Sequence, residues 1–277
     1  MRLWCIDDGV PPETIALLRD ACHDRGFDVE HVHARLFDWS CTAMPAEGDL
    51  LFRPAVSTAA RSLELHLLRP GLGTIYPTFA DAFRSVDDPG PLFAHHGIPT
   101  PRGFWCTNRN RARLRAAVDR VGGLPVVVKV DGLEGGTGVM IAESPPALFS
   151  LVDHLVTSGR TLRIMELVRG THWRAVVIGD VAVATYRNRE QPDDFRTYAG
   201  DDPVDYTLPP PAGVVDIAVR ATALTGVELG GCDVLVTECG RAVLLEVNSP
   251  CYFPQAQQVA GIDVAGALVD HLIAKVS

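Results

Sequence analysis

The sequence contains almost no lysine. Lysine occurs at only two of the 277 positions, 129 and 275, and the other basic residues are arginines. We ascribe this imbalance to a GC-rich coding bias, which carries no functional meaning. Against such a background, a lysine inside an apolar strand marks a position where arginine would not serve. Lys129 lies in such a run, PVVVKV at 125–130.

Other features are also missing, and each absence excludes a class of protein. No apolar run approaches the roughly 20 residues that a membrane span needs. The formal charge of −9 and the pI near 5.4 leave no basic footprint for nucleic acid or an anionic membrane. The seven cysteines include no C-x-x-C pair, so we expect reduced thiols. Asp7 and Asp8 come too early for a signal peptide, and we therefore expect a cytoplasmic protein.

The first 88 residues alternate between strand and helix patterns. Strands are predicted at 2–6, 29–33, 50–53 and 73–76, and helices at 12–25, 57–69 and 78–86. This alternation predicts a small α/β lobe with a parallel sheet, whose ligands bind at the carboxyl ends of strands. Arg53 lies at such an end and is a candidate for binding a substrate carboxylate. The alternative is a helix-capping or surface arginine.

Beyond a break in composition at 87–90, strands and helices continue in a less regular order. Strands are predicted at 125–130, 139–142, 161–167, 173–178, 181–186, 232–237 and 242–247. Helices are predicted at 109–121, 146–157, 213–225 and 264–276. We expect residues 187–209 to be irregular, and a polar loop to precede the last helix. The length allows two to three compact lobes.

Lys129 is followed by a glycine-rich loop. Its exposed backbone positions are Gly132, Gly135, Gly136, Thr137 and Gly138. Glycines let backbone N–H groups approach phosphate oxygens, and a lysine adds charge. The lysine precedes the glycines, unlike in a P-loop, and a strand follows where a dinucleotide fingerprint needs a helix. We predict a glycine-rich hairpin over a nucleotide, and the alternative is a flexible tip beside a snorkelling lysine.

The segment 231–250, GCDVLVTECGRAVLLEVNSP, reads as a β-hairpin with acidic residues in apolar runs. Asp233 lies in the first strand, and Glu246 and Asn248 in or just after the second. Because side chains alternate along a strand, Glu246 and Asn248 point the same way. A buried carboxylate needs a metal or a charged partner, and hard oxygen donors suit Mg²⁺ with a phosphate ligand. The alternative is that all three are water-exposed edge or turn residues.

Arginines gather between these two motifs. Arg174, Arg187 and Arg196 lie in or beside strand-like segments and would supply positive charge where phosphoryl transfer accumulates negative charge. For any single one of them a surface arginine is the favoured interpretation, and the prediction depends on their joint placement. The apolar strand end at 163–168, RIMELV, is suited to a purine edge.

In this order, the motifs resemble the ATP-grasp superfamily, and above all its RimK-like branch of carboxylate–amine ligases. The resemblance is carried by 95–101, 125–139, 163–168, 172–189, 194–200, 231–236, 244–250 and 260–272. It implies an α/β, ATP-grasp fold. The expected parts are a small N-terminal parallel α/β lobe (1–88), a central α+β lid subdomain with the glycine-rich hairpin (89–165), and a C-terminal α+β subdomain with an antiparallel sheet and the Mg²⁺ site (166–277).

The resemblance also implies the cofactors ATP and Mg²⁺ and a role for each motif. Lys129 would contact the phosphates, and Gly135 to Gly138 would cover them. Adenine would be held by Glu166 and by the backbone of Leu167 and Val168. The metal ligands would be Asp233, Glu246 and Asn248. An acyl-phosphate and its tetrahedral adduct would be stabilised by Arg174, with Arg187 or Arg196.

The implied reaction activates a small-molecule or amino-acid carboxylate as an acyl-phosphate and couples it to an amine, between two molecules or within one. Relatives usually carry a second lysine before the helix that leads into the GIPTP-like segment, but 86–90 here reads VDDPG, which leaves Arg84 as a substitute. Ser249 begins a region that usually faces the acceptor and departs from the family at 251–253. The alternatives are an ATP-grasp kinase and a catalytically decayed ATP-binding partner protein. A homodimer or homotetramer is also implied.

Overall fold

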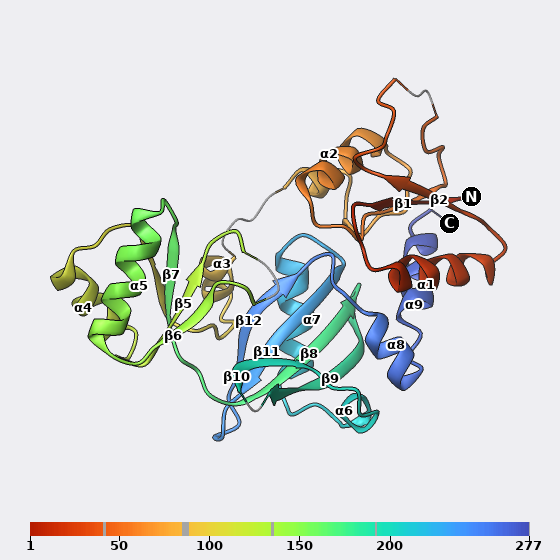
Figure 1. Cartoon of the computed structure of the whole chain (residues 1–277). Coiled ribbons are helices and arrows are strands. Elements are labelled where there is room, and N and C mark those ends of the chain that lie inside the picture. The colour runs from red at the N-terminus through yellow and green to blue at the C-terminus, as the bar shows by residue number, and fades with distance from the viewer. Residues whose placement is uncertain (41–42, 85–88, 134–135, 192, 277) are drawn as a thin grey trace.

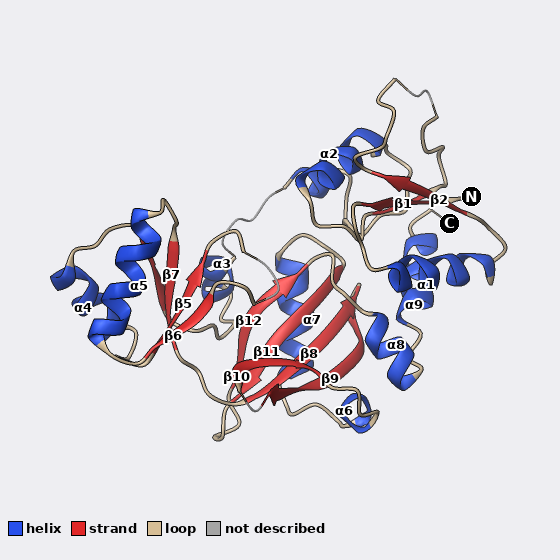
Figure 2. Cartoon of the chain, in the orientation of Figure 1, coloured by secondary structure: helices blue, strands red, loops and turns tan. Residues whose placement is uncertain are grey.

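The computed structural model describes residues 1–40, 43–84, 89–133, 136–191 and 193–276. Within these ranges, the strands form three separate sheets (Figure 1). The five-stranded sheet lies in the middle of the molecule, with the other two sheets on either side of it (Figure 2).

The N-terminal lobe contains the predicted parallel sheet. Strands β1 (Leu3–Asp7), β2 (Val29–His33) and β3 (Leu50–Phe52) pair in parallel in the order β2-β1-β3. Helix α1 (Pro12–His23) connects β1 to β2, and α2 (Thr58–Leu67) follows β3. Two predictions here were wrong: Gly73 makes only an isolated bridge to Leu50, and the segment predicted as a helix from 78 forms a short 3-10 helix, η1 (Asp81–Phe83). Thr78 accepts a hydrogen bond from the Asp81 amide at 3.3 Å and closes this single turn.

The central subdomain has an antiparallel sheet with helices on its outer face. Strands β4 (Gly103–Cys106), β5 (Val126–Val130), β6 (Val139–Ala142) and β7 (Leu162–Glu166) follow the order β4-β7-β5-β6. Apolar side chains of α4 (Arg111–Arg120) and α5 (Pro145–Thr157) fill a core against β5 and β7. The short helix α3 (Gly90–His95) instead packs on α7 (Val214–Leu224) of the next sheet.

The C-terminal sheet is antiparallel in the order β10-β9-β8-β11-β12. Its strands are β8 (Thr171–Ile178), β9 (Val181–Gln191), β10 (Asp194–Ala199), β11 (Leu229–Val236) and β12 (Ala242–Asn248). The prediction that 187–209 is irregular was wrong, because β9 continues to Gln191, β10 pairs with it, and α6 (Val204–Thr207) follows. The polar composition of β10 and of the end of β9 suits an antiparallel sheet, one face of which can meet water.

The last two helices pack against the first lobe. Helices α8 (Pro254–Ala260), which replaces part of the predicted polar loop, and α9 (Val264–Ala274) share one hydrophobic core with α1 and the N-terminal sheet. Arg25 donates to Asp270 at 2.5 Å, and Lys275 reaches Glu228 and the Tyr76 carbonyl. The two ends of the chain therefore stabilise each other, and the division at 1–88, 89–165 and 166–277 stays a prediction.

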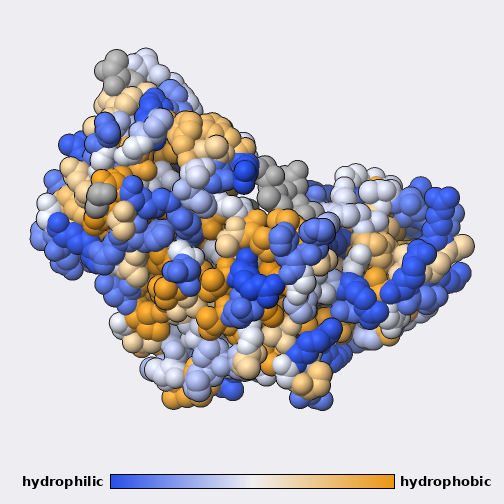
Figure 3. Space-filling model, turned by 180° about the vertical axis from the view of Figure 1, so that it is seen from behind, coloured by the Kyte–Doolittle hydropathy of each residue, from blue (hydrophilic) through white to orange (hydrophobic). Residues whose placement is uncertain are grey.

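In the described ranges, no helix is both long and apolar enough to cross a bilayer. Seen from behind, hydrophobic residues gather over the middle of the molecule, below the N-terminal lobe, with hydrophilic residues among and around them (Figure 3).

Candidate active site

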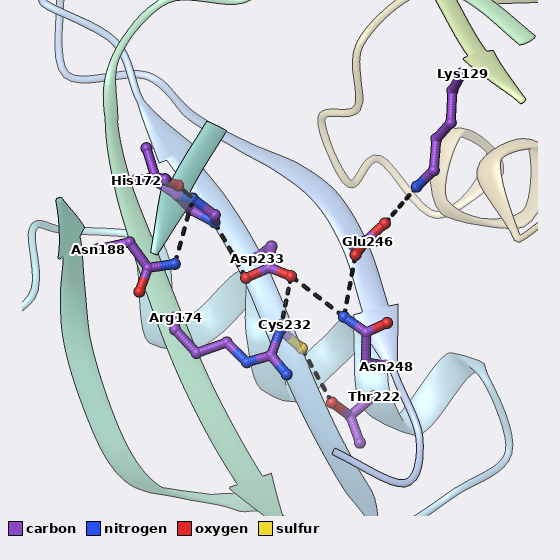
Figure 4. A network of polar contacts seen from close by, with 10 residues as sticks. Lys129, His172, Arg174, Asn188, Thr222, Cys232, Asp233, Glu246 and Asn248 are labelled. Atoms are coloured by element: carbon purple, nitrogen blue, oxygen red, sulfur yellow. Dashed lines mark hydrogen bonds and ion pairs between the residues drawn. The ribbon is translucent and has the colours of Figure 1, made fainter. Parts of the chain in front are cut away.

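The predicted hairpin is strands β11 and β12, and it brings the three proposed metal ligands together. Asp233 lies opposite Glu246, and Gly231 lies opposite Asn248. The register shifts just beyond Asp233, and such bulges often re-aim side chains beside functional sites. The Asn248 amide nitrogen lies 3.2 Å from Asp233 Oδ2 and 3.2 Å from Glu246 Oε1 (Figure 4). The three side chains therefore share one face of the sheet, as the alternation predicts.

Asp233 is the buried end of this network. Arg174 of β8, its cross-strand neighbour, donates to Asp233 Oδ2 at 2.6 Å, and His172 Nε2 lies 3.1 Å from Oδ1. Burial alone would raise the pKa of Asp233, but the opposing charge of Arg174 and the contact with His172 lower it below its ordinary value. Asp233 is therefore held as a carboxylate, and a surface-residue interpretation does not fit it.

Glu246 is the open end of the network. Lys129 on β5 of the central subdomain donates to Glu246 Oε2 at 2.5 Å (Figure 4). The side chains of Lys129 and Glu246 are 38% and 40% exposed, whereas that of Asp233 is 11% exposed. The nearly unique lysine thus joins the central subdomain to the C-terminal sheet at a place that solvent and ligands can reach.

The glycine-rich loop contacts the C-terminal sheet at β10, the edge strand opposite to β12. Arg196 of β10 donates to the Gly136 carbonyl at 3.2 Å and is paired with Asp194 at 2.6 Å. Gly138 has φ +81°, and a Cβ there would meet the side chain of Leu133 at 2.6 Å, so this turn requires glycine. Thr137 is exposed beside it, and Gly135 lies outside the described residues.

The predicted adenine-binding segment ends β7. Glu166 accepts from Arg102 Nε at 2.6 Å, and its side chain is largely buried. Leu167 and Val168 follow in irregular backbone and are half-buried, between the central sheet and β8. This is the linker between the two subdomains that carry Lys129 and Glu246.

Three predicted arginines are held elsewhere. Arg187 donates to the buried carboxylate of Asp205 at 3.0 Å. Arg53 is buried, not on the surface, and donates to Glu64 at 2.8 Å, also contacting the Ala55 carbonyl. Arg84 is 71% exposed and is paired with Asp81 at 2.9 Å. Roles for these three in catalysis, substrate binding and phosphate binding stay predictions.

Several buried polar atoms around the network lack a hydrogen-bond partner among the described residues. They include Ser249 Oγ, Arg174 Nε and Asn188 Oδ1. Leaving such an atom unsatisfied costs about 1–3 kcal/mol, and native proteins concentrate the exceptions where function requires them. That Ser249 faces a substrate stays a prediction.

Two members of the network escaped the sequence analysis. His172 bridges Asp233 and Thr197, and Asn188 lies 3.4 Å from His172 Nδ1. The signal was strand alternation, because His172 lies two residues before Arg174 and therefore on the same face. The 11-residue length of β9, which carries Asn188 to this face, was not predicted.

The donor chemistry of the network fits Mg²⁺ bound together with a phosphate. The described part of the chain contains no group of three or more His, Cys, Asp or Glu side chains that would hold a metal alone. Two carboxylates and one amide leave room for water and phosphate oxygens, which Mg²⁺ usually retains among its ligands. Lys129 and Arg174 balance the carboxylate charge in this conformation.

Relatives were found for most of the chain. Residues 81–272 match the RimK-like ATP-grasp domain. A protein named probable alpha-L-glutamate ligase, from Rhodopirellula baltica, is 30% identical over 201 residues, which are 71% of this chain and 47% of that protein. One of the same name from Citrobacter koseri is 32% identical over 199 residues, 69% of this chain and 63% of that protein. The chain thus spans between about half and two thirds of these relatives.

Solved structures share the whole fold. The ATP-grasp ligase PsnB, solved with a phosphomimetic variant of a minimal precursor, Mg and ADP, has a TM-score of 0.75 at 18% identity and covers 99% of this chain and 98% of that one. A RimK domain ATP-grasp protein from Sphaerobacter thermophilus has a TM-score of 0.70 at 22% identity, covering 98% and 99%. These likenesses confirm the predicted ATP-grasp fold. Together with the match over residues 81–272, they lead to one conclusion: the chain belongs to the RimK-like ATP-grasp family.

Proposed function

We propose that the protein is an ATP-dependent carboxylate–amine ligase that uses Mg²⁺ and releases ADP and phosphate. The observation that carries the proposal is the contact between Lys129 and Glu246. It brings Lys129 of the central subdomain, the proposed phosphate ligand, against Glu246 of the C-terminal sheet, a proposed metal ligand. Two relatives named ligases and the ADP and Mg in the PsnB structure support the same assignment.

The proposed reaction has two steps. A carboxylate oxygen of the substrate attacks the γ-phosphorus of ATP, and ADP leaves. The amine nitrogen then attacks the acyl carbon, phosphate leaves, and the amine loses a proton to phosphate or water. In the proposed site, Mg²⁺ held by Asp233, Glu246 and Asn248 would neutralise charge on the phosphates.

The chain's own groups would bind, orient and exclude water. Lys129 exchanges Glu246 for phosphate oxygens, since a lysine acts as a mobile point charge. Arg174, fixed by Asp233 beneath the site, stabilises the negative charge of the acyl-phosphate. Arg196 holds the glycine-rich loop through the Gly136 carbonyl, so that the loop can shield the acyl-phosphate from hydrolysis.

The substrate pair is the less defined part of the proposal. We propose a small-molecule or amino-acid carboxylate, with the amine on a second molecule or on the same one. The unsatisfied hydroxyl of Ser249 lies next in sequence to Asn248 and would contact this substrate.

The test is a screen for products. Amino acids and other small carboxylates are incubated with ATP and Mg²⁺, with hydroxylamine as a general amine acceptor, and ADP, AMP and phosphate are measured. We expect at least one carboxylate to stimulate release of ADP and phosphate, with formation of a hydroxamate. Release of AMP and pyrophosphate would contradict the proposal. A stable phosphorylated product without coupling would identify a kinase, and tight ATP binding without turnover across the screen a decayed partner protein.

A further inference from the structure

One face of the central sheet carries a row of cationic and aromatic side chains. In the register of the strands, Trp105 of β4 lies opposite Arg163 of β7, and Arg163 lies opposite Lys129 of β5. Residues that oppose each other across a sheet project from the same face. Lys129 extends from this face to Glu246, so Arg163 and Trp105 belong to the face that meets the C-terminal sheet.

The opposite face of these strands is filled. Val128 and Ile164, the neighbours of Lys129 and Arg163 along their strands, are fully buried in the core under α4 and α5. The Arg163 side chain therefore does not lie in this core.

Placing Lys129 and Arg163 directly opposite each other is unfavourable by itself. Like charges that lie directly opposite each other in a cross-strand pair destabilise a sheet. In this conformation each cation has a partner: Lys129 contacts Glu246, and the Arg163 guanidinium lies over the Trp105 ring, 5.7 Å from its centre. An anion between the two would remove the repulsion and accept hydrogen bonds from both.

The next row on the same face is apolar. Two residues along each strand, Met165 lies opposite Val127, and Val127 lies opposite Ile141. Glu166 and the linker at 167–168 continue from this row. A nucleotide has an apolar base at one end and charged phosphates at the other, and the two rows offer matching surfaces in that order.

A hollow lies beside Arg163. It measures about 440 Å³ and is lined by Arg163, Trp105 and Arg102 together with Gly90, Pro91 and Ala94 of α3. Cavities of roughly 300–1,000 Å³ are usual for small ligands. The sequence before this helix carries no lysine, and Arg84 is exposed and paired with Asp81. Among the residues that line the hollow, Arg163 is the cation adjacent to Lys129 in the sheet.

We propose that Arg163 is a second phosphate-binding residue, which leaves the Trp105 ring and, with Lys129, holds the α- and β-phosphates of the nucleotide. The inference rests on the proposed function, because it requires a nucleotide at this face. It assigns to β7 the phosphate contact that the segment 86–90 does not supply.

The test compares ADP with adenosine, which lacks phosphates. Dissociation constants of both are measured by displacement of a fluorescent ADP analogue in the presence of Mg²⁺. The variants are Arg163→Gln, Arg163→Lys and, as a matched control on the outer face, the exposed Arg113→Gln. We expect Arg163→Gln to weaken ADP about tenfold, which is about 1.4 kcal/mol, and to leave adenosine unchanged. Arg163→Lys should recover part of the affinity, and Arg113→Gln should match the unsubstituted protein.

Each other outcome has a defined meaning. Equal ADP affinity in Arg163→Gln and the unsubstituted protein overturns the inference and leaves the ligase proposal intact. An equal loss for ADP and adenosine overturns it too, because Arg163 would then act on the base or on the fold, and thermal unfolding of each variant identifies the latter. Failure of the unsubstituted protein to bind ADP overturns the inference together with the proposed function.

Discussion

Two clusters in this molecule combine the same chemical groups but differ in their access to solvent. In the N-terminal lobe, Glu64 accepts from Arg53 at 2.8 Å, from Tyr76 at 3.0 Å and from Arg61. In the C-terminal sheet, Glu246 accepts from Lys129 at 2.5 Å and from Asn248 at 3.2 Å. Each cluster is a carboxylate with at least one cation and one neutral donor, so the kinds of group present do not separate them.

Exposure separates them. The Glu64 side chain is 2% exposed, and several donors use both of its oxygens, so no site for a ligand remains. The Glu246 side chain is 40% exposed, and its cation comes from another subdomain. A buried, fully paired carboxylate maintains the fold, whereas a half-open one whose partner can move is suited to binding. The predictions below test this contrast.

The largest expected effect comes from neutralising the two carboxylates in turn. Glu246→Gln should lower the rate of ADP formation by about 100-fold or more, because a ligand of the proposed metal loses its charge, with little change in thermal unfolding. Glu64→Gln should instead destabilise the protein by about 3–5 kcal/mol, since it leaves buried arginine unpaired. Denaturant unfolding and steady-state rates measure both. Loss of stability in Glu246→Gln with normal activity would reverse the contrast.

A smaller effect is expected from Gly231→Ala. A Cβ at position 231 would collide with the guanidinium of Arg174 and with the Cβ of Cys251. Displacing Arg174 from Asp233 should slow turnover on the order of 10- to 100-fold, the cost of misplacing a catalytic group by about 1 Å. Gly230→Ala is the matched control, because a Cβ there collides with Thr222 and not with Arg174. Equal rates in the two variants would argue against a role for Arg174.

Exchanging the two lysines for arginine sharpens the comparison further. Lys129→Arg should weaken Mg-ADP about tenfold, because a planar fork cannot replace a compact point charge between Glu246 and phosphates. Lys275→Arg, which alters the contact with Glu228, should leave ADP affinity unchanged. Titration of both variants with ADP gives the result. Full affinity in Lys129→Arg would show that position 129 does not require lysine.

The smallest effect is expected at Arg196, which contacts the glycine-rich loop. Hydrogen bonds from the Arg196 side chain and amide lower the pKa of Asp194 to about 2, from an ordinary value of 3.8. Because the pKa is lowered in the folded state, this contribution to stability is complete above the ordinary value and is lost as the pH falls from about 4 to about 2. Arg196→Gln should return the Asp194 pKa toward its ordinary value, as NMR titration would record. An unchanged pKa would show that Arg196 is not its partner in solution.

Sequence reasoning predicted most of the fold, and its failures share a cause. Apolar periodicity located the hairpin of β11 and β12 and the strand with Lys129 within one to three residues at each end. It missed β10 and the last five residues of β9, because strand segments rich in polar residues lack that periodicity. It also missed α8, a helix that packs into a hydrophobic core shared with the N-terminal lobe.

Site residues were predictable where alternation within one strand sufficed. Glu246 and Asn248 share a face for that reason, and Asp233 follows from hairpin pairing. Contacts between side chains of different helices and strands were not predictable. The commitment of Arg53 to Glu64 and of Arg187 to Asp205 depends on tertiary packing, which no local pattern encodes.

The central claim, that Glu246 and Lys129 form a nucleotide–metal site, is tested most directly by the effect of Mg²⁺ on ADP affinity. Titrations with and without Mg²⁺ are compared for the unsubstituted protein and Glu246→Gln. The account predicts that Mg²⁺ strengthens ADP binding about tenfold or more in the unsubstituted protein and that the gain disappears in Glu246→Gln. An undiminished gain in the variant, or no gain in either protein, would contradict it.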